Sequence, residues 1–288
     1  MSRFTLVRHG ESTHNASGRW QGQSDVPLSE RGRKQALAVG ARLRDSQFDL
    51  RLTSDLSRAS DTADAIGPAA RDVRLREIDV GRWAGLLRTE VAERFPEELA
   101  TLREGGTLPI GGGESMQGFE ARVDALFDDL AARHRGRQIL LVTHGGLVRV
   151  VLTRALELRG RPPALIGALN TSLTTIEWTQ DGPRVAVFND TAHVDDPDPL
   201  PEGARAILVS DDDRPADRSF ADRLLVALRV PHAYSLGERP LGRALRARAL
   251  PERDEALPAL AEEHEDGAFV LVAPPARVRA LIARSIEA

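Results

Sequence analysis

The sequence predicts an α/β fold: a three-layer α/β/α sandwich around a mostly parallel sheet. Three observations lead to this prediction. Short apolar runs typical of buried strands alternate with amphipathic helical runs through residues 1–195. Two of the strand runs lead, within two residues, to a histidine followed by glycine. The chain, at 288 residues, is also long enough to bury a large core.

The first predicted strand, Phe4 to Val7, leads into Arg8, His9 and Gly10. Gly10 breaks the apolar run, so Arg8 and His9 are expected at the carboxyl edge of the sheet, where open α/β folds bind their ligands. A neutral imidazole nitrogen is a good nucleophile toward phosphorus, and a guanidinium offers paired hydrogen bonds to phosphoryl oxygens. The pair therefore indicates a phosphate site. A solvated arginine beside a structural histidine is the alternative.

A second strand end repeats this arrangement. Ile139 to Thr143 is followed by His144, Gly145 and Gly146, and then by an amphipathic run from Leu147 to Leu158. The two glycines let the backbone pass close to a ligand, and the helix that they open directs free amide groups toward an anion. Two strand-end histidines of this kind favour a catalytic site over simple packing.

The other elements of the first domain continue the alternation of strand and helix. Ser29 is the expected N-cap of a helix over Glu30–Arg44. Further strands are expected at Leu50–Thr53, Val73–Leu75, Leu173–Thr179 and Arg184–Asn189, and further helices at Leu56–Ile66, Thr89–Arg103 and Ser115–Arg133.

These motifs resemble the histidine phosphatase superfamily, also called the phosphoglycerate mutase-like family, from about Ser2 to about Asp195. The segment Arg8-His9-Gly10-Glu11-Ser12 is similar to the family's nucleophile motif, which implies that His9 is transiently phosphorylated. His144 matches the second histidine of the family. Arg58, in Ser54-Asp55-Leu56-Ser57-Arg58-Ala59, matches its second arginine, and the resemblance rather than the spacing identifies it. With Arg8, these residues would form a four-residue phosphate pocket.

The resemblance also implies a proton donor, because Glu77 falls where the family carries one. A departing alkoxide needs a proton, and the same carboxylate would later accept one from the water that hydrolyses phosphohistidine. Glu11 and Asp79 are the alternatives for this role. The stretch that lines the substrate side of the pocket in the family is matched by Asn15, Gln21 and Gly22. The backbone of Gly145 is also expected beside the substrate.

Both mutases and phosphatases belong to this family. The mutases that the chain resembles keep a lysine and paired arginines in the covering segment, whereas residues 86–113 contain no lysine and space Arg88, Arg94 and Arg103 along one predicted helix. Positive charge is needed to retain a bisphosphate, so we expect a phosphatase that hydrolyses small phosphomonoesters through phosphohistidine, with no metal or other cofactor. A cofactor-dependent phosphoglycerate mutase and a non-catalytic phosphate-binding scaffold are the alternatives.

Composition narrows the expected partners and location. The net charge is −4 without a basic stripe, which argues against nucleic acid, and the absence of cysteine excludes disulfides and thiolate metal sites. The sequence shows no signal-peptide pattern and no apolar run of about 18 residues, so we expect a cytoplasmic protein that does not bind membranes. The expected partner is a small phosphorylated metabolite.

The sequence after the first domain predicts a linker and a second region. Prolines and carboxylates in residues 196–203 suit a linker, and residues 204–288 are expected to form a small C-terminal α/β region. Strands are expected at Ala206–Val209 and Phe269–Val272, and helices at Ala216–Arg229, Leu241–Ala249, Leu257–Glu265 and Ala276–Ile286.

The role of this C-terminal region stays open. Ile207 to Asp211 echoes Thr5 to His9, and Phe269 to Pro275 echoes Ile139 to Gly145, which suggests a degenerate partial repeat with Asp211 and Pro274 in place of histidines. The alternative is that short apolar strands recur in any βα unit. The acidic triplet that begins at Asp211 is interpreted as a solvated turn rather than a metal pocket. Packing on the main domain, covering the site and forming a homodimer are the roles considered.

Overall fold

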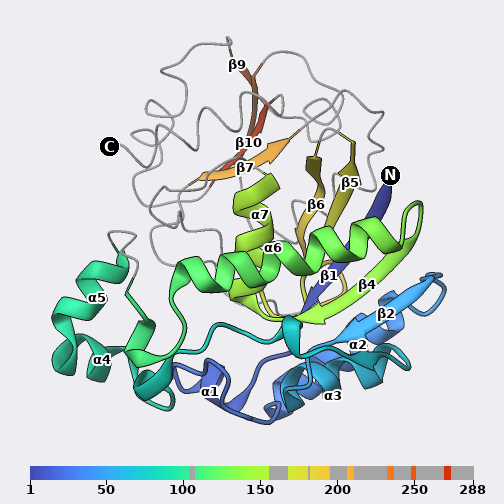
Figure 1. Cartoon of the computed structure of the whole chain (residues 1–288). Helices are drawn as coiled ribbons and strands as arrows, with labels where there is room; N and C mark the ends of the chain where they lie inside the picture. Colours follow the sequence, from blue (N-terminus) through green and yellow to red (C-terminus); the bar gives the residue numbers. More distant parts are fainter. Residues whose placement is uncertain are drawn as a thin grey trace. The chain divides into compact units, whose positions relative to one another are not determined.

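A computed structural model describes residues 1–103, 108–155, 168–180 and 182–194, together with strands at 206–210, 232–236, 248–250 and 269–273 (Figure 1). The chain divides into two compact units, Met1–Asp198 and Pro199–Ala288. The expected linker at 196–203 and the expected helices at 216–229, 257–265 and 276–286 lie outside the described residues.

A six-stranded sheet forms the centre of the first unit. Its strands are β1 (Ser2–Arg8), β2 (Leu50–Thr53), β3 (Ala70–Arg71), β4 (Gln138–Thr143), β5 (Leu173–Thr179) and β6 (Gly182–Asp190). They lie in the order β3-β2-β4-β1-β5-β6, with the first four parallel and β5 antiparallel to both of its neighbours. The predicted mostly parallel sheet is confirmed. The carboxyl ends of β1, β2 and β4 therefore share one edge.

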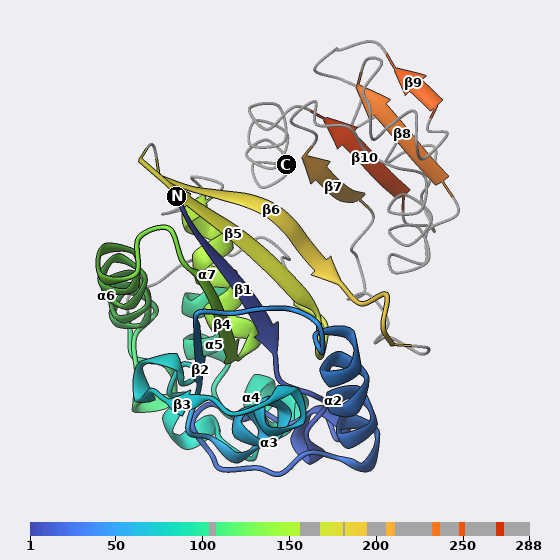
Figure 2. The ribbon, with the colours of Figure 1, turned by 90° about the vertical axis from the view of Figure 1, so that its right-hand side faces the viewer.

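Helices cover both faces of this sheet and complete the predicted three layers (Figure 2). On one face, α6 (Met116–Arg133) and α7 (Gly145–Ala155) belong to the apolar cluster that contains Phe4, Leu6 and Leu141. On the other face, α2 (Glu30–Arg42) and α3 (Ser57–Ile66) pack with Val7 and Val142. Successive residues of β1 and β4 thus enter opposite clusters, which explains their continuous apolar sequences.

Ser29 caps α2 as expected, since its hydroxyl accepts a hydrogen bond from the Gly32 N–H at 2.9 Å. The predicted strand at Val73–Leu75 is wrong, because this segment is a single 3-10 turn. The Asp72 carboxylate accepts from the Arg74 N–H and caps that turn, while the residues that pair with β2 are those of β3.

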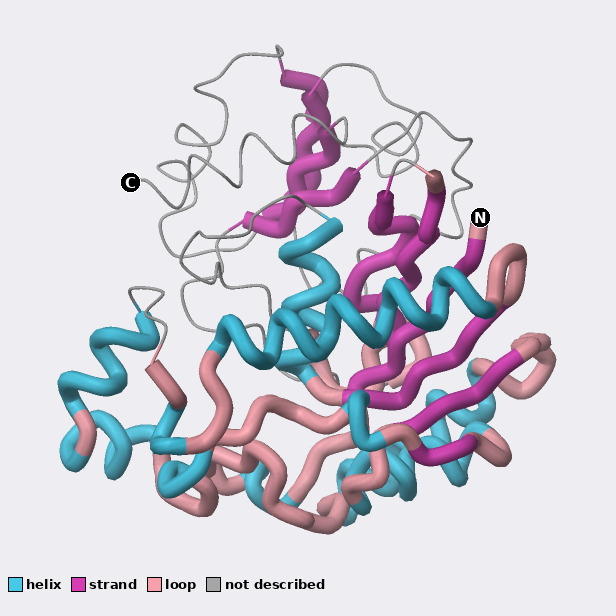
Figure 3. The backbone as a smooth tube through the Cα atoms, viewed as in Figure 1, coloured by secondary structure: helices cyan, strands magenta, loops and turns pink. Residues whose placement is uncertain are grey.

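The predicted single helix at Thr89–Arg103 is also wrong. It is two helices, α4 (Arg88–Arg94) and α5 (Pro96–Arg103). Pro96 lacks the N–H that a continuous helix needs and disfavours the helical conformation at the residue before it. The remaining elements are α1 (Thr13–Ala16) and 3-10 turns at Gly81–Trp83 and Ile110–Gly112. Much of the chain between α3 and α6 is loop (Figure 3).

The second unit contains a four-stranded parallel sheet. Its strands are β7 (Ala206–Ser210), β8 (His232–Leu236), β9 (Arg248–Leu250) and β10 (Phe269–Ala273), in the order β7-β10-β8-β9. β7 and β10 match expected strands. β9 overlaps the end of the helix expected at Leu241–Ala249, so pairing with β8 overrides the helix propensity of that alanine-rich and arginine-rich run. Among the described residues, no helix is long and apolar enough to cross a bilayer.

Candidate active site

His9 follows the last residue of β1 and is 3 % exposed. Its backbone N–H donates to the Thr143 carbonyl of the neighbouring strand at 2.9 Å, and its own carbonyl accepts from the Asn170 amide at 2.8 Å. The ring atom Nδ1 lies 2.6 Å from the Gly10 carbonyl oxygen. A carbonyl only accepts, so Nδ1 carries the ring proton and Nε2 keeps the free lone pair.

The surroundings keep this imidazole neutral. Burial holds the pKa of His9 well below its usual value of 6.5, and the positive charges of Arg58 and Arg8 lower it further. A neutral ring with its proton committed to Nδ1 is the nucleophilic form of histidine. The site therefore stabilises the reactive state without an added base.

His144 follows β4 as His9 follows β1, and the parallel pairing of these strands brings the two rings together. Their centroids are 5.1 Å apart with planes inclined at 59°. His144 is fully buried, and its Nε2 lies 2.9 Å from the hydroxyl of Ser54, the first residue after β2. Burial, followed by the positive charges of Arg58, Arg8 and Arg122, holds the pKa of His144 well below its usual value.

Arg58, in the first turn of α3, is a buried cation beside these histidines. It is 1 % exposed, and it donates to the carbonyls of Gly22 and Ser24 at 2.8 Å each. Burial lowers the pKa of Arg58 to about 10, so it remains protonated at neutral pH. Its Nε has no hydrogen-bond partner within the part of the chain that the structure describes. A protonated guanidinium with an unbonded N–H group can donate a hydrogen bond to a bound anion.

Arg8, at the end of β1, is half-buried and donates to the Ala168 carbonyl at 2.5 Å. Gly145 lies against it, since a Cβ placed on Gly145 would be 3.4 Å from Arg8 Nε. The absence of a side chain at Gly145 therefore lets the backbone at the start of α7 lie close to the guanidinium.

Glu77 lies in a loop between two 3-10 turns and is half-buried. One carboxylate oxygen accepts from the Gly146 N–H and the other from the Ile78 N–H, both at 2.9 Å. Gly146 is two residues beyond His144, so this carboxylate lies beside the histidine cluster. Its negative charge also acts on Arg58.

The two alternative acids have other contacts. Glu11 accepts from the Ser29 hydroxyl at 2.6 Å and from Arg31 at 2.8 Å, at the start of α2. Asp79 accepts from the Gly81 N–H at 2.9 Å within its own loop. Of the three carboxylates, Glu77 is the one bonded to the backbone next to the His144 motif.

The residues expected to line the substrate side differ in their contacts. Gly22, with φ +53°, gives its carbonyl to Arg58 and so belongs to the Arg58 site. Gln21 accepts from the Ser12 hydroxyl at 2.7 Å. Asn15 accepts from the Ser12 N–H at 3.2 Å and completes the capping box of α1, whose N-cap is Ser12, so these contacts are with the start of its own helix.

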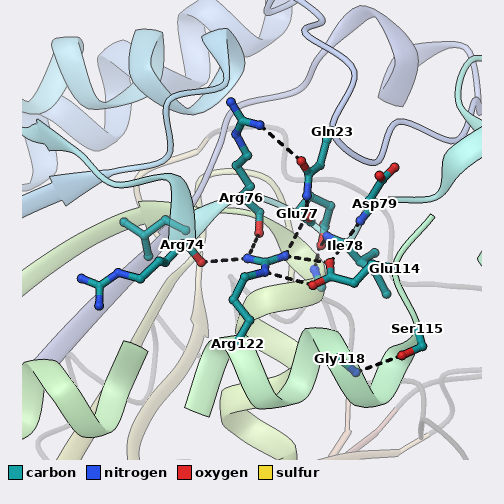
Figure 4. A network of polar contacts seen from close by, with 12 residues as sticks. Gln23, Arg74, Arg76, Glu77, Ile78, Asp79, Glu114, Ser115, Gly118 and Arg122 are labelled. Atoms are coloured by element: carbon teal, nitrogen blue, oxygen red, sulfur yellow. Dashed lines mark hydrogen bonds and ion pairs between the residues drawn. The ribbon is translucent and has the colours of Figure 1, made fainter. Parts of the chain in front are cut away.

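Three residues of this site were not found by sequence reasoning. Ser54 contacts His144, Asn170 holds the His9 carbonyl, and Arg122 donates to the Glu77 carbonyl at 3.2 Å (Figure 4). Ser54 has a usable signal, since it follows a predicted strand at the same sheet edge. Asn170 and Arg122 depend on long-range contacts and have no local signal. Among the described residues, no group of three or more histidines and carboxylates is placed to hold a metal ion.

The buried neutral histidines predict a pH-dependent stability. The unfolded chain takes up protons on histidine near pH 6.5, while His9 and His144 resist protonation in the folded state. His193, whose pKa burial lowers to about 4, acts in the same direction. The free energy of unfolding should therefore fall as the pH drops below about 6.5, by up to about 1.4 kcal/mol per pH unit for each histidine.

Urea unfolding from about pH 7.5 to about pH 5.5 measures this slope. The variant His144→Asn should have a shallower slope than the wild type, because it removes one buried titrating group. An unchanged slope in that variant would mean that His144 takes up its proton in the folded state.

The family model described as histidine phosphatase superfamily (branch 1) matches residues 4–191. A protein named probable phosphoglycerate mutase from Salmonella choleraesuis (strain SC-B67) is 35% identical over 211 residues, which are 68% of this chain and 97% of the relative. A protein named metal-independent phosphoserine phosphatase from Arabidopsis thaliana is 35% identical over 204 residues, 67% of this chain and 84% of the relative.

Solved structures with the same fold include two phosphatases. Mycobacterial glucosyl-3-phosphoglycerate phosphatase has 35% identity and a TM-score of 0.60, over 65% of this chain and 98% of that protein. A mutant phosphoserine phosphatase from Entamoeba histolytica, solved in complex with phosphoserine, has 26% identity and a TM-score of 0.61, over 67% of this chain and 100% of that protein.

Proposed function

Because the chain belongs to the histidine phosphatase superfamily, we propose that it hydrolyses small phosphomonoesters through a phosphohistidine on His9. It is a phosphoric monoester hydrolase, as are its relatives named phosphatases. The observation that carries the role of His9 is its hydrogen bond to the Gly10 carbonyl, which leaves Nε2 unprotonated in a buried, neutral ring.

In the first step, the Nε2 lone pair of His9 attacks phosphorus and the ester P–O bond breaks. Arg8 and Arg58 donate to the non-bridging oxygens, whose charge shifts in the transition state, and His144 adds a further ring to this anion site. Glu77 delivers a proton to the departing alkoxide. The products of this step are an alcohol and a phosphohistidine.

In the second step, water attacks phosphorus and the P–N bond breaks. The Glu77 carboxylate, now unprotonated, takes a proton from that water, as microscopic reversibility requires. Inorganic phosphate leaves, and His9 returns to the neutral state that its surroundings favour. The two guanidinium groups neutralise the phosphoryl charge throughout, so the proposed mechanism uses no metal.

The relatives guide the choice of substrate class. One acts by name on phosphoserine, and another on glucosyl-3-phosphoglycerate. We take small phosphorylated metabolites as the substrate class of this chain. Gln21, which is bonded to Ser12, and Gly22, which is bonded to Arg58, are proposed to line the substrate side of the site. A panel of sugar phosphates, phosphoserine, phosphoglycerates and nucleotides, compared by kcat/KM, identifies the preferred member.

Hydrolysis is favoured over phosphoryl transfer to a second substrate by the segment between α3 and α6. The two helices α4 and α5 there contain no lysine. Arg82 and Arg94 both lie over the Phe95 ring, at 5.0 and 5.4 Å, and Arg82 is paired with Glu98. Incubation with 3-phosphoglycerate separates the two activities, since a phosphatase releases inorganic phosphate and a mutase forms the 2-phospho isomer.

Hydrolysis of p-nitrophenyl phosphate in the presence of a chelator tests the proposed function. The enzyme should keep its activity, because the phosphate charge is balanced by Arg8 and Arg58. Full loss of activity on chelation, with recovery on return of a divalent metal, would contradict the proposal.

Gly146→Ala is expected to reduce activity without loss of stability. A Cβ on Gly146 would lie 2.1 Å from the Glu77 carboxylate, so that flexible group must move. Alanine is favoured over glycine within a helix by about 1 kcal/mol, which supports α7. Displacing a proton donor by about 1 Å can cost on the order of 10²-fold in kcat.

Steady-state rates with an alkyl phosphate and thermal unfolding check this result. The matched control is Gly118→Ala in α6, where the nearest atom to the new Cβ is the Ser115 hydroxyl at 3.3 Å. Equal rates in Gly146→Ala and Gly118→Ala would contradict the placement of Glu77.

A further inference from the structure

The Glu77 carboxylate is held by two backbone N–H groups, and the Glu77 backbone carbonyl is held by the side chain of Arg122. Arg76 to Val80 forms neither helix nor strand, so its carbonyl groups lack partners from regular structure. The Arg122 guanidinium, from α6, donates to the carbonyls of Arg74, Arg76 and Glu77 at 2.8, 3.0 and 3.2 Å (Figure 4). One side chain thus fixes three peptide groups around the proposed acid.

Glu114 holds Arg122 in this position. Its two carboxylate oxygens accept from Arg122 Nε and Nη2 at 3.0 and 2.9 Å, in a paired geometry. The same carboxylate accepts from the Asp79 N–H at 3.3 Å, and the Glu114 N–H donates to the Asp79 carbonyl at 2.8 Å. The pair therefore holds the loop on both sides of Glu77.

On the basis of the proposed function, we propose that Arg122 and Glu114 are positioning residues that aim the Glu77 carboxyl at the leaving group. Neither contacts the side chains of His9, Arg8 or Arg58 among the contacts described above. Their contacts with the proposed acid are made through its backbone, while the Gly146 N–H orients the carboxylate itself. The charge of Arg122 also lowers the pKa of His144. Loss of this pair should weaken protonation of the leaving group and leave the attack by His9 intact.

Dependence on the leaving group distinguishes positioning from general stability. An alkyl phosphate needs a proton on its departing oxygen, whereas p-nitrophenyl phosphate has a leaving group that departs without one. Arg122→Ala should lower the rate of phosphoenzyme formation from glycerol phosphate by about 10²-fold and change the rate of phosphoenzyme formation from p-nitrophenyl phosphate by less than about 5-fold. Arg122→Lys, which keeps one charge but loses the planar fork, should be intermediate.

Arg154→Ala is the matched control. Arg154 has a similar side-chain exposure, 24% against 22% for Arg122, and it also forms an ion pair with a carboxylate of α6. Its loss should lower both rates equally or not at all. Should Arg122→Ala fail to fold, Glu114→Gln tests the same contacts with little change of shape.

The positioning role of Arg122 and Glu114 and the proposed phosphatase function are contradicted by different results. Equal losses for both substrates in Arg122→Ala and Glu114→Gln, alongside a leaving-group effect in Glu77→Gln, would overturn the positioning role alone. An inactive wild type would instead contradict the proposed function.

A second observation, independent of the first, concerns the C-terminal sheet. When the strands of the second unit are numbered along the chain, their order across the sheet is first, fourth, second, third, that is β7-β10-β8-β9. The four parallel strands of the first unit lie in the same order, as β1-β4-β2-β3. All neighbouring pairs are parallel in both sets. The two sheets therefore share one topology.

The pairing register agrees as well. Leu6 pairs with Leu141 and Val7 with Val142 in the first unit, while Leu208 pairs with Leu271 and Val209 with Val272 in the second. The sequences of these strands correspond at the same positions, Thr5-Leu6-Val7 with Ile207-Leu208-Val209 and Ile139-Leu140-Leu141-Val142 with Phe269-Val270-Leu271-Val272. A single alignment of the two units therefore matches their strand sequences and their pairing registers.

The correspondence continues beyond the strands in the sequence. Val148, Arg149 and Arg154 match Val278, Arg279 and Arg284 at a constant spacing from β4 and β10. Leu56-Ser57-Arg58-Ala59 has a counterpart in Leu241-Gly242-Arg243-Ala244, which also follows the second strand of its unit.

We infer that the second unit is a shortened copy of the phosphatase fold that has lost the phosphohistidine chemistry. In this alignment, Ser210 and Asp211 occupy the positions of Arg8 and His9. Ala273 and Pro274 occupy the positions of Thr143 and His144. Asp211 and Pro274 have no imidazole nitrogen with which to form phosphohistidine, and Ser210 lacks the positive charge of Arg8. All phosphoryl transfer is then carried by the first unit.

Engineered disulfides in the full chain test the topology, because the protein has no cysteine. Leu271→Cys should form a disulfide with Leu208→Cys and, in a separate variant, with Tyr234→Cys, since both pairs are register partners. The control pair Leu208→Cys with Tyr234→Cys is separated by a strand, at about 10 Å, beyond the reach of about 7 Å for a disulfide. Should these variants not fold, Phe269 with Ala206 or His232 gives a second set at the strand starts.

A disulfide in the control pair, or none in the register pairs, would overturn the shared topology. Peptide mapping of the wild-type chain after reaction with a phosphomonoester tests the chemistry. Phosphohistidine should be absent from the peptides of residues 199–288, which contain His232 and His264. Phosphate on either histidine would overturn the inference that this copy is catalytically inert.

Discussion

Replacing His9 with alanine is expected to lower kcat for phosphomonoester hydrolysis by about 10⁴-fold or more. The proposed nucleophile is the His9 imidazole, which burial keeps neutral and whose Nδ1 is bonded to the Gly10 carbonyl. Alanine leaves the arginines in place, so substrate binding should persist while turnover is lost. Steady-state kinetics with p-nitrophenyl phosphate, and binding of inorganic phosphate by calorimetry, measure the two effects separately.

His134→Ala is the control for this prediction. His134 follows α6, and its carbonyl accepts from the hydroxyl of Ser2 at the opposite end of β1 from His9. Its kcat should stay within about 2-fold of the wild type, as expected of a surface substitution. A His9→Ala enzyme as active as His134→Ala would show that another residue is the nucleophile.

Glu77→Gln has the second largest expected effect. Glutamine keeps the shape of the side chain and cannot give or take the proton, so kcat for alkyl phosphates should fall by about 10²–10⁴-fold. The loss should be much smaller for formation of the phosphoenzyme from p-nitrophenyl phosphate, whose leaving group needs no proton. Single-turnover rates with the two substrates reveal this difference.

Glu11→Gln provides the matched control, because the carboxylate of Glu11 bonds to Ser29 and Arg31. It should retain most of the wild-type rate with both substrates. A larger loss in Glu11→Gln than in Glu77→Gln would assign the acid to Glu11 instead.

Much of the fold was predictable because local pattern and tertiary structure agree. β2 has the expected bounds, and Ser29 caps α2 as expected, since apolar runs and cap chemistry act over a few residues. The failures have physical causes. Val73–Leu75 alternates like a strand but is closed into a turn by the Asp72 carboxylate, and β9 is a strand through its pairing with β8. The two residues of β3 are too few to show any period.

The site was predictable to the extent that strand ends define it. His9 and His144 are found by the rule that parallel strands end at one edge, and the structure places their rings together. Arg58 needed the family resemblance, because one arginine among many on an ordinary helix has no distinguishing pattern. Arg122 and Asn170 could not be found from the sequence, because their contacts with the Glu77 and His9 carbonyls join distant segments.

Trapping the phosphoenzyme tests whether His9 is the nucleophile. The wild-type enzyme, mixed rapidly with a phosphomonoester and quenched in base, should carry a phosphoryl group that is labile to acid, as a phosphoramidate bond is. Mass spectrometry of the peptides should place it on His9. An enzyme that turns over with no phosphoryl group on His9, or with the group on another residue, would contradict the account.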